Sequence, residues 1–387
     1  MYMNNFEFYN PVRIIFGRGS IARLSSQIPA SSKVLMVYGG GSIKKNGVYE
    51  QVKDALKDYE VIEFSGIEPN PKYETCMDAI AICRDQQVDY IVSVGGGSVL
   101  DASKFIAAGS KYAGDDPWDL PAKGAEVKDA IPLGCVMTLP ATGSEMNAGA
   151  VISRISTSEK LYFGSDKVYP RFSILDPSTT FSLPPRQTAN GIVDVFVHVL
   201  EQYATFPGQA PLQDRFAESI MLTLVEAAAK IAENPEDYDA RADVMWCATQ
   251  ALNGNIGLGV PQDWSTHNIG HELTAFYGLD HAQTLAVLWP GVARFNLANK
   301  QEKLAQMGRR VWGLSGSDEQ VADACIDRTE EFFAQVGMAT KLSAYQVDAV
   351  EAGAKIRERF TQRGVMAQGE RGNLTPEIVE QIIVARA

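Results

Sequence analysis

A chain of 387 residues with 45% hydrophobic residues and a net charge of -12 is typical of a globular protein with more than one domain. The negative charge argues against nucleic acid or an anionic membrane as the main partner, and no apolar run approaches the roughly 20 residues that a membrane span needs. The N-terminus carries no basic segment followed by an apolar one, and the five cysteines are scattered, so we expect no signal peptide, reduced thiols and a cytoplasmic location.

The first half of the chain alternates short β-rich runs with helix-length segments such as "KYETCMDAIAICRDQQ". This alternation predicts a parallel, Rossmann-like sheet with helical crossovers. Ligands of such a sheet bind beyond the carboxyl ends of its strands. The β-rich runs cover residues 13–17, 33–38, 61–67, 89–94, 135–140 and 172–177.

The second half changes character after "SLPPRQ" (182–187). Strand-like runs disappear, and Ala, Leu and Glu recur with helical spacing, as in "DRFAESIMLTLVEAAAKIAE". Two prolines at 184 and 185 suit a linker that leads into the first turn of a helix. We therefore expect an α/β domain over residues 1–185 and an all-helical domain over residues 186–387.

A glycine-rich loop, "VSVGGGSVLDASK" (92–104), joins a strand to a probable helix start. Gly95, Gly96, Gly97 and Ser98 would let the backbone approach a ligand, and a helix N-terminus presents free N–H groups to phosphate. A tight turn is the alternative, although one glycine would usually suffice for it. We favour a phosphate-binding loop.

A second loop, "TLPATGSEMN" (138–147), also leaves a strand and is rich in hydroxyl groups. Thr138, Thr142 and Ser144 could donate hydrogen bonds to phosphate or ribose oxygens. Thr142 or Ser144 could equally cap a helix. The cofactor interpretation gains weight because this is a second such loop on the same expected sheet edge.

A third loop, "VYGGGSIKKNG" (37–47), indicates which cofactor is used. Enzymes that prefer NAD usually place an acidic residue near the adenosine ribose. Here the strand end carries Gly39, Gly40, Gly41 and Ser42, and two lysines, Lys44 and Lys45, follow. The absence of an acidic residue and the presence of two cations favour NADP(H), although either lysine could simply be solvated.

All four histidines lie in the helical half of the chain. Asp194 and His198 are four residues apart, and so are His267 and His271, so each pair shares one face of a helix. With His281 close by, they predict a site for Fe(II) or Zn(II). Three imidazoles and one carboxylate would suffice, and spacing alone does not show which histidine stays free.

Asp280, next to His281 in "GLDH", is a rival carboxylate ligand. Its place in a probable turn makes a helix cap the expected role.

Taken together, "GGGSVLDASK", "TLPATGSEMN", "DVFVH" and "THNIGHELTAFYGLDHAQT" resemble the iron-containing (group III) alcohol dehydrogenases, over nearly the whole chain. Within that family the sequence is most similar to the NADPH-dependent aldehyde reductases of the butanol dehydrogenase branch. The resemblance implies the fold of that family, a dimer or larger oligomer, with a homodimer as our expectation, and hydride transfer between NADP(H) and a small aldehyde or alcohol. It also implies that cofactor and metal meet between the two domains.

The resemblance carries functional residues onto this chain position by position. The metal ligands fall on Asp194, His198, His267 and His281, which leaves His271 as the candidate proton relay. The cofactor contacts fall on Gly95, Gly96, Gly97, Ser98, Asp101, Thr138, Thr142, Ser144, Asn147, Lys160 and Leu183. Asp101 is also counted as a second catalytic candidate. Family members that prefer NAD carry an acidic residue at the position of Gly39.

Other functions remain open at this point. A glycerol dehydrogenase-like polyol oxidoreductase or a dehydroquinate synthase-like cyclase would share the architecture, but the cyclase needs Arg and Lys near the histidines and "VPQDWSTHNIGHELTAFYGLDHAQT" has none. A metal-dependent hydrolase or a non-catalytic metal-binding protein would lack a saturable nucleotide site.

Overall fold

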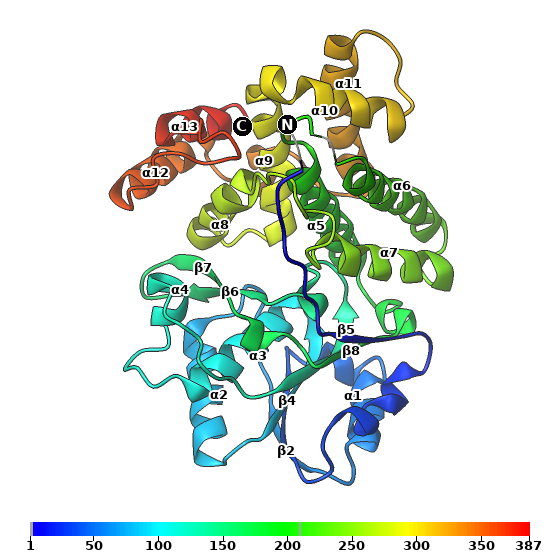
Figure 1. Cartoon of the computed structure of the whole chain (residues 1–387), viewed down its shortest axis with the longest axis vertical. Coiled ribbons are helices and arrows are strands. Elements are labelled where there is room, and N and C mark those ends of the chain that lie inside the picture. The colour runs from blue at the N-terminus through cyan, green and yellow to red at the C-terminus, as the bar shows by residue number, and fades with distance from the viewer. Residues whose placement is uncertain (1–2, 209) are drawn as a thin grey trace. The chain divides into compact units, whose positions relative to one another are not determined.

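The computed structural model describes residues 3–208 and 210–387, which form two compact units (Figure 1). The sheet unit contains residues 9–184 and 234–249, and the helical unit contains the rest. The chain passes from one unit to the other between residues 184 and 185, beside the expected boundary. Residues 234–249 belong to the sheet unit, whereas the sequence predicts them in the helical domain, and residues 3–8 belong to the helical unit.

The sheet unit is built on six strands that all run parallel, which confirms the predicted sheet. Each of the six β-rich runs of the sequence supplies one strand. In sheet order the strands are β1 (Arg13–Phe16), β8 (Phe172–Leu175), β5 (Leu133–Leu139), β4 (Tyr90–Gly96), β2 (Lys33–Tyr38) and β3 (Glu60–Phe64).

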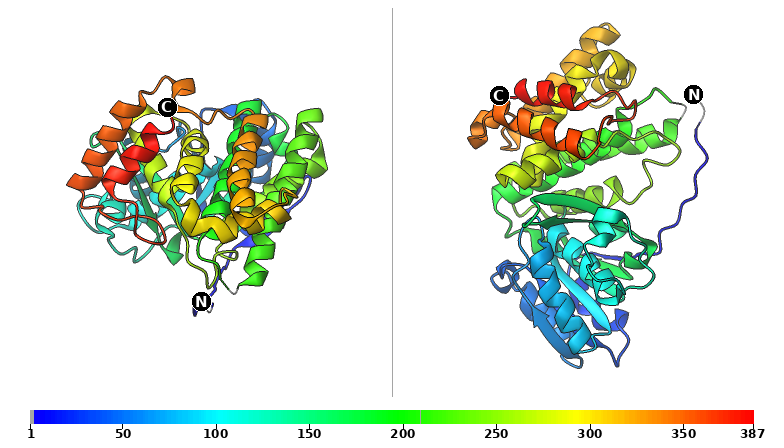
Figure 2. Two further views of the ribbon diagram at one scale, coloured as in Figure 1. Left: turned by 90° about the horizontal axis from the view of Figure 1, so that it is seen from above. Right: turned by 90° about the vertical axis from the view of Figure 1, so that its left-hand side faces the viewer.

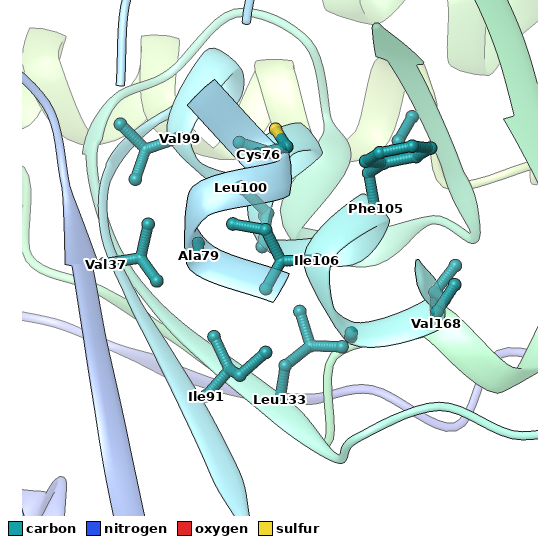
Figure 3. Close-up of a cluster of buried hydrophobic side chains, with 14 of the residues drawn as sticks. Val37, Cys76, Ala79, Ile91, Val99, Leu100, Phe105, Ile106, Leu133 and Val168 are labelled. Atoms are coloured by element: carbon teal, nitrogen blue, oxygen red, sulfur yellow. The ribbon is translucent and has the colours of Figure 1, made fainter. Parts of the chain in front are cut away.

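Both faces of the central strands are buried, because alternate side chains of one strand point into two separate cores. In β2, Leu35 and Val37 enter one core, and Met36 enters the other. The first core is covered by α2 (Tyr73–Asp85) and α3 (Gly97–Lys111), as Figure 3 shows for Cys76, Ala79 and Phe105. The second core is covered by α1 (Val48–Ala55) and by the 3-10 helix at Ser20–Arg23.

Three further elements belong to the sheet unit. The strands β6 (Gly149–Arg154) and β7 (Glu159–Gly164) form an antiparallel hairpin that the sequence analysis did not predict. A short helix, α4 (Asp119–Lys123), lies near β7. Most of α7 (Tyr238–Ala251) packs here too, where Thr249 donates a 2.6 Å hydrogen bond to the buried carboxylate of Glu145.

The helical unit contains no strands within the described residues. Helix α5 begins at Pro185, at the point where the two prolines predicted a helix start. In Figure 2, α12 and α13 run side by side, and they share an apolar core with α8 and α9. The helices are α5 (Pro185–Tyr203), α6 (Pro211–Glu233), α8 (Ser265–Tyr277), α9 (His281–Phe295), α10 (Leu297–Arg310), α11 (Asp318–Gln335), α12 (Ala349–Gln362) and α13 (Pro376–Val384).

None of the helices in the described part of the chain is long and apolar enough to cross a membrane.

Candidate active site

The three glycine-containing loops lie together at one edge of the sheet. They follow β2, β4 and β5, which are neighbours in the sheet order and run parallel, so their carboxyl ends meet at the same edge. This arrangement is the one that the sequence analysis expected.

The first two loops pack against each other so tightly that glycine is needed at their contact. A Cβ atom on Gly97 would lie 2.3 Å from the hydroxyl oxygen of Thr142, and one on Gly96 would lie 2.9 Å from the Cβ of Leu139. Within the first loop itself, a Cβ atom on Gly95 would lie 2.5 Å from a methyl group of Val99. Helix α3 begins at Gly97, so the first N–H groups of the helix point out of this loop without partners in the helix itself. These N–H groups are suited to bind the oxygens of a phosphate.

A buried lysine that the sequence analysis missed holds the second loop in place. Lys104, on α3, is fully buried, and its ammonium group donates to the backbone oxygens of Ser144, Asn147 and Gly149 and to the side-chain oxygens of Ser144 and Asn147, all at 2.8–3.0 Å. Burial lowers the pKa of Lys104 to about 8, against the opposing effect of Asp101. The loop is therefore shaped before any ligand binds.

Asp101 completes this arrangement. Its carboxylate accepts hydrogen bonds from the Ser144 hydroxyl at 2.7 Å and from the backbone N–H of Val151 at 2.9 Å. Ser144 itself is only 2% exposed. These contacts tie α3 to the second loop and to β6, while the catalytic and cofactor roles of Asp101 stay predictions.

The remaining predicted cofactor residues lie at separate places in the sheet unit. Thr138, the first residue of the second loop, still lies on β5, and Lys160 stands on β7, where its ammonium group donates to Asn70 at 2.9 Å. Leu183 is half-buried near the end of the unit. The third loop is open, because a Cβ on Gly40 or Gly41 would meet nothing within 4 Å.

In the helical unit, three helices bring the predicted metal ligands together. Asp194 and His198 lie on α5, His267 lies on α8, and His281 is the first residue of α9. The donor atoms of Asp194, His267 and His281 all lie within 4.8 Å of one another. Asp194 Oδ1 is 3.9 Å from His267 Nε2 and 3.7 Å from His281 Nε2.

His198 lies directly beside this group of three. Its Nδ1 is 3.7 Å from Asp194 Oδ1, and its ring stacks on that of His267 with 4.6 Å between the ring centroids. The ring of His271 is 5.4 Å from that of His281 and outside the group. The predicted division into four ligands and one remaining histidine is compatible with this geometry and stays a prediction.

One side of the cluster is more accessible than the others. The side chains of Asp194 and His198 are 5% exposed, whereas that of His281 is 22% exposed. His271 is half-buried next to His281. The cluster is therefore most open on the side of His281 and His271.

The donor set suits a divalent metal ion. Within residues 3–208 and 210–387, the buried atoms His198 Nδ1 and His267 Nε2 have no hydrogen-bond partner. A buried nitrogen without a partner costs free energy, and coordination of a cation would remove that cost. Imidazole nitrogens with one carboxylate and no thiolate fit Fe(II) or Zn(II).

The electrostatics of the two stacked histidines differ. Burial lowers the pKa of His198 to about 4, so its ring is neutral and able to coordinate. Burial also disfavours the charged form of His267, but the carboxylates of Glu201 and Asp194 outweigh it and raise its pKa to about 9. A divalent cation at this site would compete with that second ring proton for a nitrogen of His267.

Glu201 is a second residue that the sequence analysis missed. It lies on α5, is 2% exposed, and accepts a hydrogen bond from His267 Nδ1. The contact leaves Nε2 of the same ring to face Asp194. A signal was present in the sequence, because a glutamate seven residues after Asp194 lies on the same face of the helix.

Asp280 has the expected role of a helix cap. It begins α9 through a capping box with Gln283, and its carboxylate also accepts hydrogen bonds from Arg186 and Asn190 at 2.9 and 2.8 Å. Among the described residues, the group of side chains that could hold a metal ion consists of Asp194, His267 and His281 and does not include Asp280.

Known proteins match this chain over nearly its whole length. The "NADPH-dependent aldehyde reductase YqhD" of Escherichia coli K12 is 54% identical over 386 residues, which cover 99% of this chain and 100% of that protein. The crystal structure of the E. coli K-12 protein superposes with a TM-score of 0.98, at 52% identity and full coverage of both chains. The NADH-dependent butanol dehydrogenase A of Thermotoga maritima superposes with a TM-score of 0.96 at 35% identity, covering 100% of this chain and 99% of that chain.

Two family descriptions divide the chain between them. "Iron-containing alcohol dehydrogenase" matches residues 11–177, and "Fe-containing alcohol dehydrogenase family, C-terminal" matches residues 188–385. The first match lies in the part with the glycine loops and the second in the part with the histidines. The chain is therefore an oxidoreductase that belongs to the iron-containing alcohol dehydrogenase family.

Proposed function

We propose that this protein interconverts short-to-medium-chain aldehydes and primary alcohols by hydride transfer, with NADP(H) and one divalent metal ion, Fe(II) or Zn(II). The observation that carries the proposal is the convergence of Asp194, His267 and His281 from three helices onto one buried point. The 54% identity to an enzyme named as an NADPH-dependent aldehyde reductase supports the choice of substrate and cofactor.

The helical unit would hold the metal through Asp194, His198, His267 and His281. When bound, the metal would polarise the carbonyl oxygen of the substrate, and NADPH would supply the hydride. Asp194 would place one negative charge against the cation. Glu201 would fix the ring of His267 so that Nε2 stays turned toward Asp194.

The sheet unit would hold the cofactor. The first N–H groups of α3 would bind the pyrophosphate, and Thr142 would line the same loop. Ser144 and Asn147 would act together with Lys104, which keeps their loop in one conformation. In the third loop, Gly39 to Ser42 would lie beside the adenosine ribose without a carboxylate to repel a 2′-phosphate.

His271 would handle the proton. It is half-buried, and its ring lies 5.4 Å from that of His281 on the accessible side of the cluster. It can hold a proton on a ring nitrogen and pass it, directly or through water, to the alcohol oxygen during aldehyde reduction.

We also propose a homodimer in the cytoplasm. The cytoplasmic location is supported by the five cysteines, which are all buried free thiols. The dimer is supported by several large exposed apolar side chains, among them Phe6, Phe8 and Tyr9 near the N-terminus.

The test is a spectrophotometric assay of metal-reconstituted protein with aldehydes of increasing chain length. We expect saturable loss of NADPH absorbance, with Fe(II) or Zn(II) required and with NADH a poorer donor. Saturable NADPH binding without turnover of any aldehyde, or activity confined to glycerol and related polyols, would contradict the proposed reaction.

A further inference from the structure

A cluster of two tyrosines, a lysine and a glutamate lies at the ends of β2 and β3, and we call it the tyrosine cradle (Tyr38, Tyr49, Lys53 and Glu63). The hydroxyl groups of Tyr38 and Tyr49 donate to the Glu63 carboxylate at 3.1 and 3.0 Å. The ammonium group of Lys53 binds the same carboxylate at 2.9 Å. The carboxylate thus has three donors from this chain.

Lys44 lies over the tyrosine cradle. Its ammonium nitrogen is 5.2 Å from the ring centroid of Tyr38 and 4.8 Å from that of Tyr49. The two rings meet edge to face with 6.0 Å between their centroids. Cation–π attraction to two rings restrains a lysine that is otherwise exposed to solvent.

The charges of this region do not cancel. Lys53 occupies Glu63, and no ion pair joins Lys44 to Glu63 among the ion pairs of the described residues. The region therefore carries two positive charges against one negative charge. Partial burial opposes ionisation of Glu63, but the hydrogen bonds from Lys53, Tyr49 and Tyr38 outweigh it and hold its pKa below the usual value. Glu63 therefore stays paired with Lys53, and the charge of Lys44 remains available.

The position of Lys44 matters because it adjoins the third glycine loop. Tyr38 is the last residue of β2, the glycines 39–41 follow, and Lys44 ends the 3-10 turn Ser42–Lys44. The space above Gly40 and Gly41 is open. A group bound at this carboxyl edge of the sheet would lie close to the ammonium group.

We propose that the tyrosine cradle holds Lys44 as the cation that binds the 2′-phosphate of the nucleotide, and that it keeps Glu63 from neutralising Lys44. The proposal rests on the proposed use of NADP(H) and names the residues that select it. Lys45, the next residue, has no such contacts with the cradle in the described structure and would contribute only general charge.

The test compares two nucleotide fragments that differ only in the 2′-phosphate, adenosine 2′,5′-bisphosphate and 5′-AMP, by isothermal titration calorimetry. Lys44→Met should weaken binding of the bisphosphate by about tenfold and that of 5′-AMP by less than about twofold. Lys45→Met, the matched control, should change the bisphosphate affinity by less than about threefold. Equal losses in the two variants would mean that the loop acts only through its net charge, and the proposal would be wrong.

A second variant tests the tyrosine cradle itself. Tyr49→Phe keeps the ring under Lys44 but removes one donor from Glu63, so the carboxylate can turn toward Lys44. We expect the preference for the bisphosphate to fall by about threefold with the melting temperature unchanged. Tyr59→Phe is the control, because the Tyr59 hydroxyl bonds the backbone oxygens of Ser25 and Ile28 instead. An unchanged preference in Tyr49→Phe would show that Glu63 has no part in it.

The outcomes separate this proposal from the proposed function. If wild-type protein binds neither NADPH nor the bisphosphate saturably, the proposed function fails. If wild-type protein prefers the bisphosphate and Lys44→Met keeps that preference, only the role of Lys44 is refuted.

Discussion

The carboxylate of Glu201 accepts a hydrogen bond from the ring Nδ1 of His267 and, at the same time, from the backbone N–H groups of Thr266 at 2.6 Å and His267 at 3.3 Å. Those N–H groups belong to the first turn of α8, where helical partners are missing. One buried carboxylate therefore fixes both the ring of a proposed ligand and the end of the helix that carries it.

Replacement of Glu201 by Gln should weaken metal binding. An amide cannot supply the charge that favours the N–H of His267, so we expect the metal affinity to fall by about 10- to 100-fold, measured by competition with a chelator. Glu218→Gln is a matched control, since Glu218 is also buried but bonds Tyr203 and Arg310. Loss of stability in both variants with wild-type metal affinity in Glu201→Gln would contradict the role of Glu201.

His271 and His267 should respond differently to replacement by Ala. His271→Ala should retain metal but lose about 100-fold or more in turnover, because a proton donor is removed. His267→Ala should lose metal and turnover together, because a ligand is removed. Metal content by elemental analysis and kcat with butanal decide the matter, and loss of metal from His271→Ala would mean that ligand and relay have been exchanged.

The buried triad of Lys300, Asp263 and Glu370 should make the helical unit sensitive to acid. Lys300 bonds both carboxylates at 2.9 Å, and the side chains of all three are at most 4% exposed. Burial opposes ionisation of Asp263, but Lys300 and Ser265 outweigh it and lower its pKa. As the pH falls, Asp263 is therefore protonated in the unfolded chain at a higher pH than in the folded protein. The stabilisation that its carboxylate gives the folded protein is present above about pH 4 and is lost as the pH falls through the folded-state pKa.

Asp263→Asn should thus cost about 3 kcal/mol of unfolding free energy near pH 7, and the difference from wild type should shrink below about pH 4. Urea unfolding at both pH values measures it. Glu370→Gln should cost less, because burial raises the pKa of Glu370 and Lys300 would keep Asp263 as its partner. A constant difference at both pH values would exclude Asp263 as the titrating group.

Lys104→Met should disrupt the second loop. The substitution removes the ammonium group that lies within 3.0 Å of five oxygens in a buried place, so we expect a loss of about 3 kcal/mol in unfolding free energy and weaker NADPH binding. Lys111→Met, on the exposed end of the same helix, should change neither. Wild-type stability in Lys104→Met would show that the loop holds its shape without the lysine.

Much of the fold could be predicted because its signals are local. Every strand of the main sheet is a short apolar run, and parallel pairing follows from the helices between them. The hairpin of β6 and β7 was missed because its turn, residues 155–158, lacks the Asn-Gly or Asp-Gly pair that marks tight hairpins. The sequence of α7 has no pronounced apolar face, so it says nothing about the unit against which this helix packs.

The site was predictable where residue type alone carries the chemistry. Only four histidines exist, so the convergence of His267 and His281 with Asp194 could be expected. Lys104 could not be recognised in the same way, and the spacing of Glu201 from Asp194 was only a weak signal, because charged residues are common on helices and only the packing shows that these two are buried. Their partners, His267 and the loop around Ser144, are 66 and 40 residues away in sequence.

Helix α5 carries Asp194, His198 and Glu201 along a single stripe. Inserting or deleting one residue between positions 194 and 201 would rotate part of that stripe by about 100°, so the ion, its imidazole neighbours and the hydrogen bond behind them would all lose alignment at once. The length of helix between positions 194 and 201 is therefore as constrained as the three side chains themselves, and length variation in relatives should be confined to loops outside this stripe.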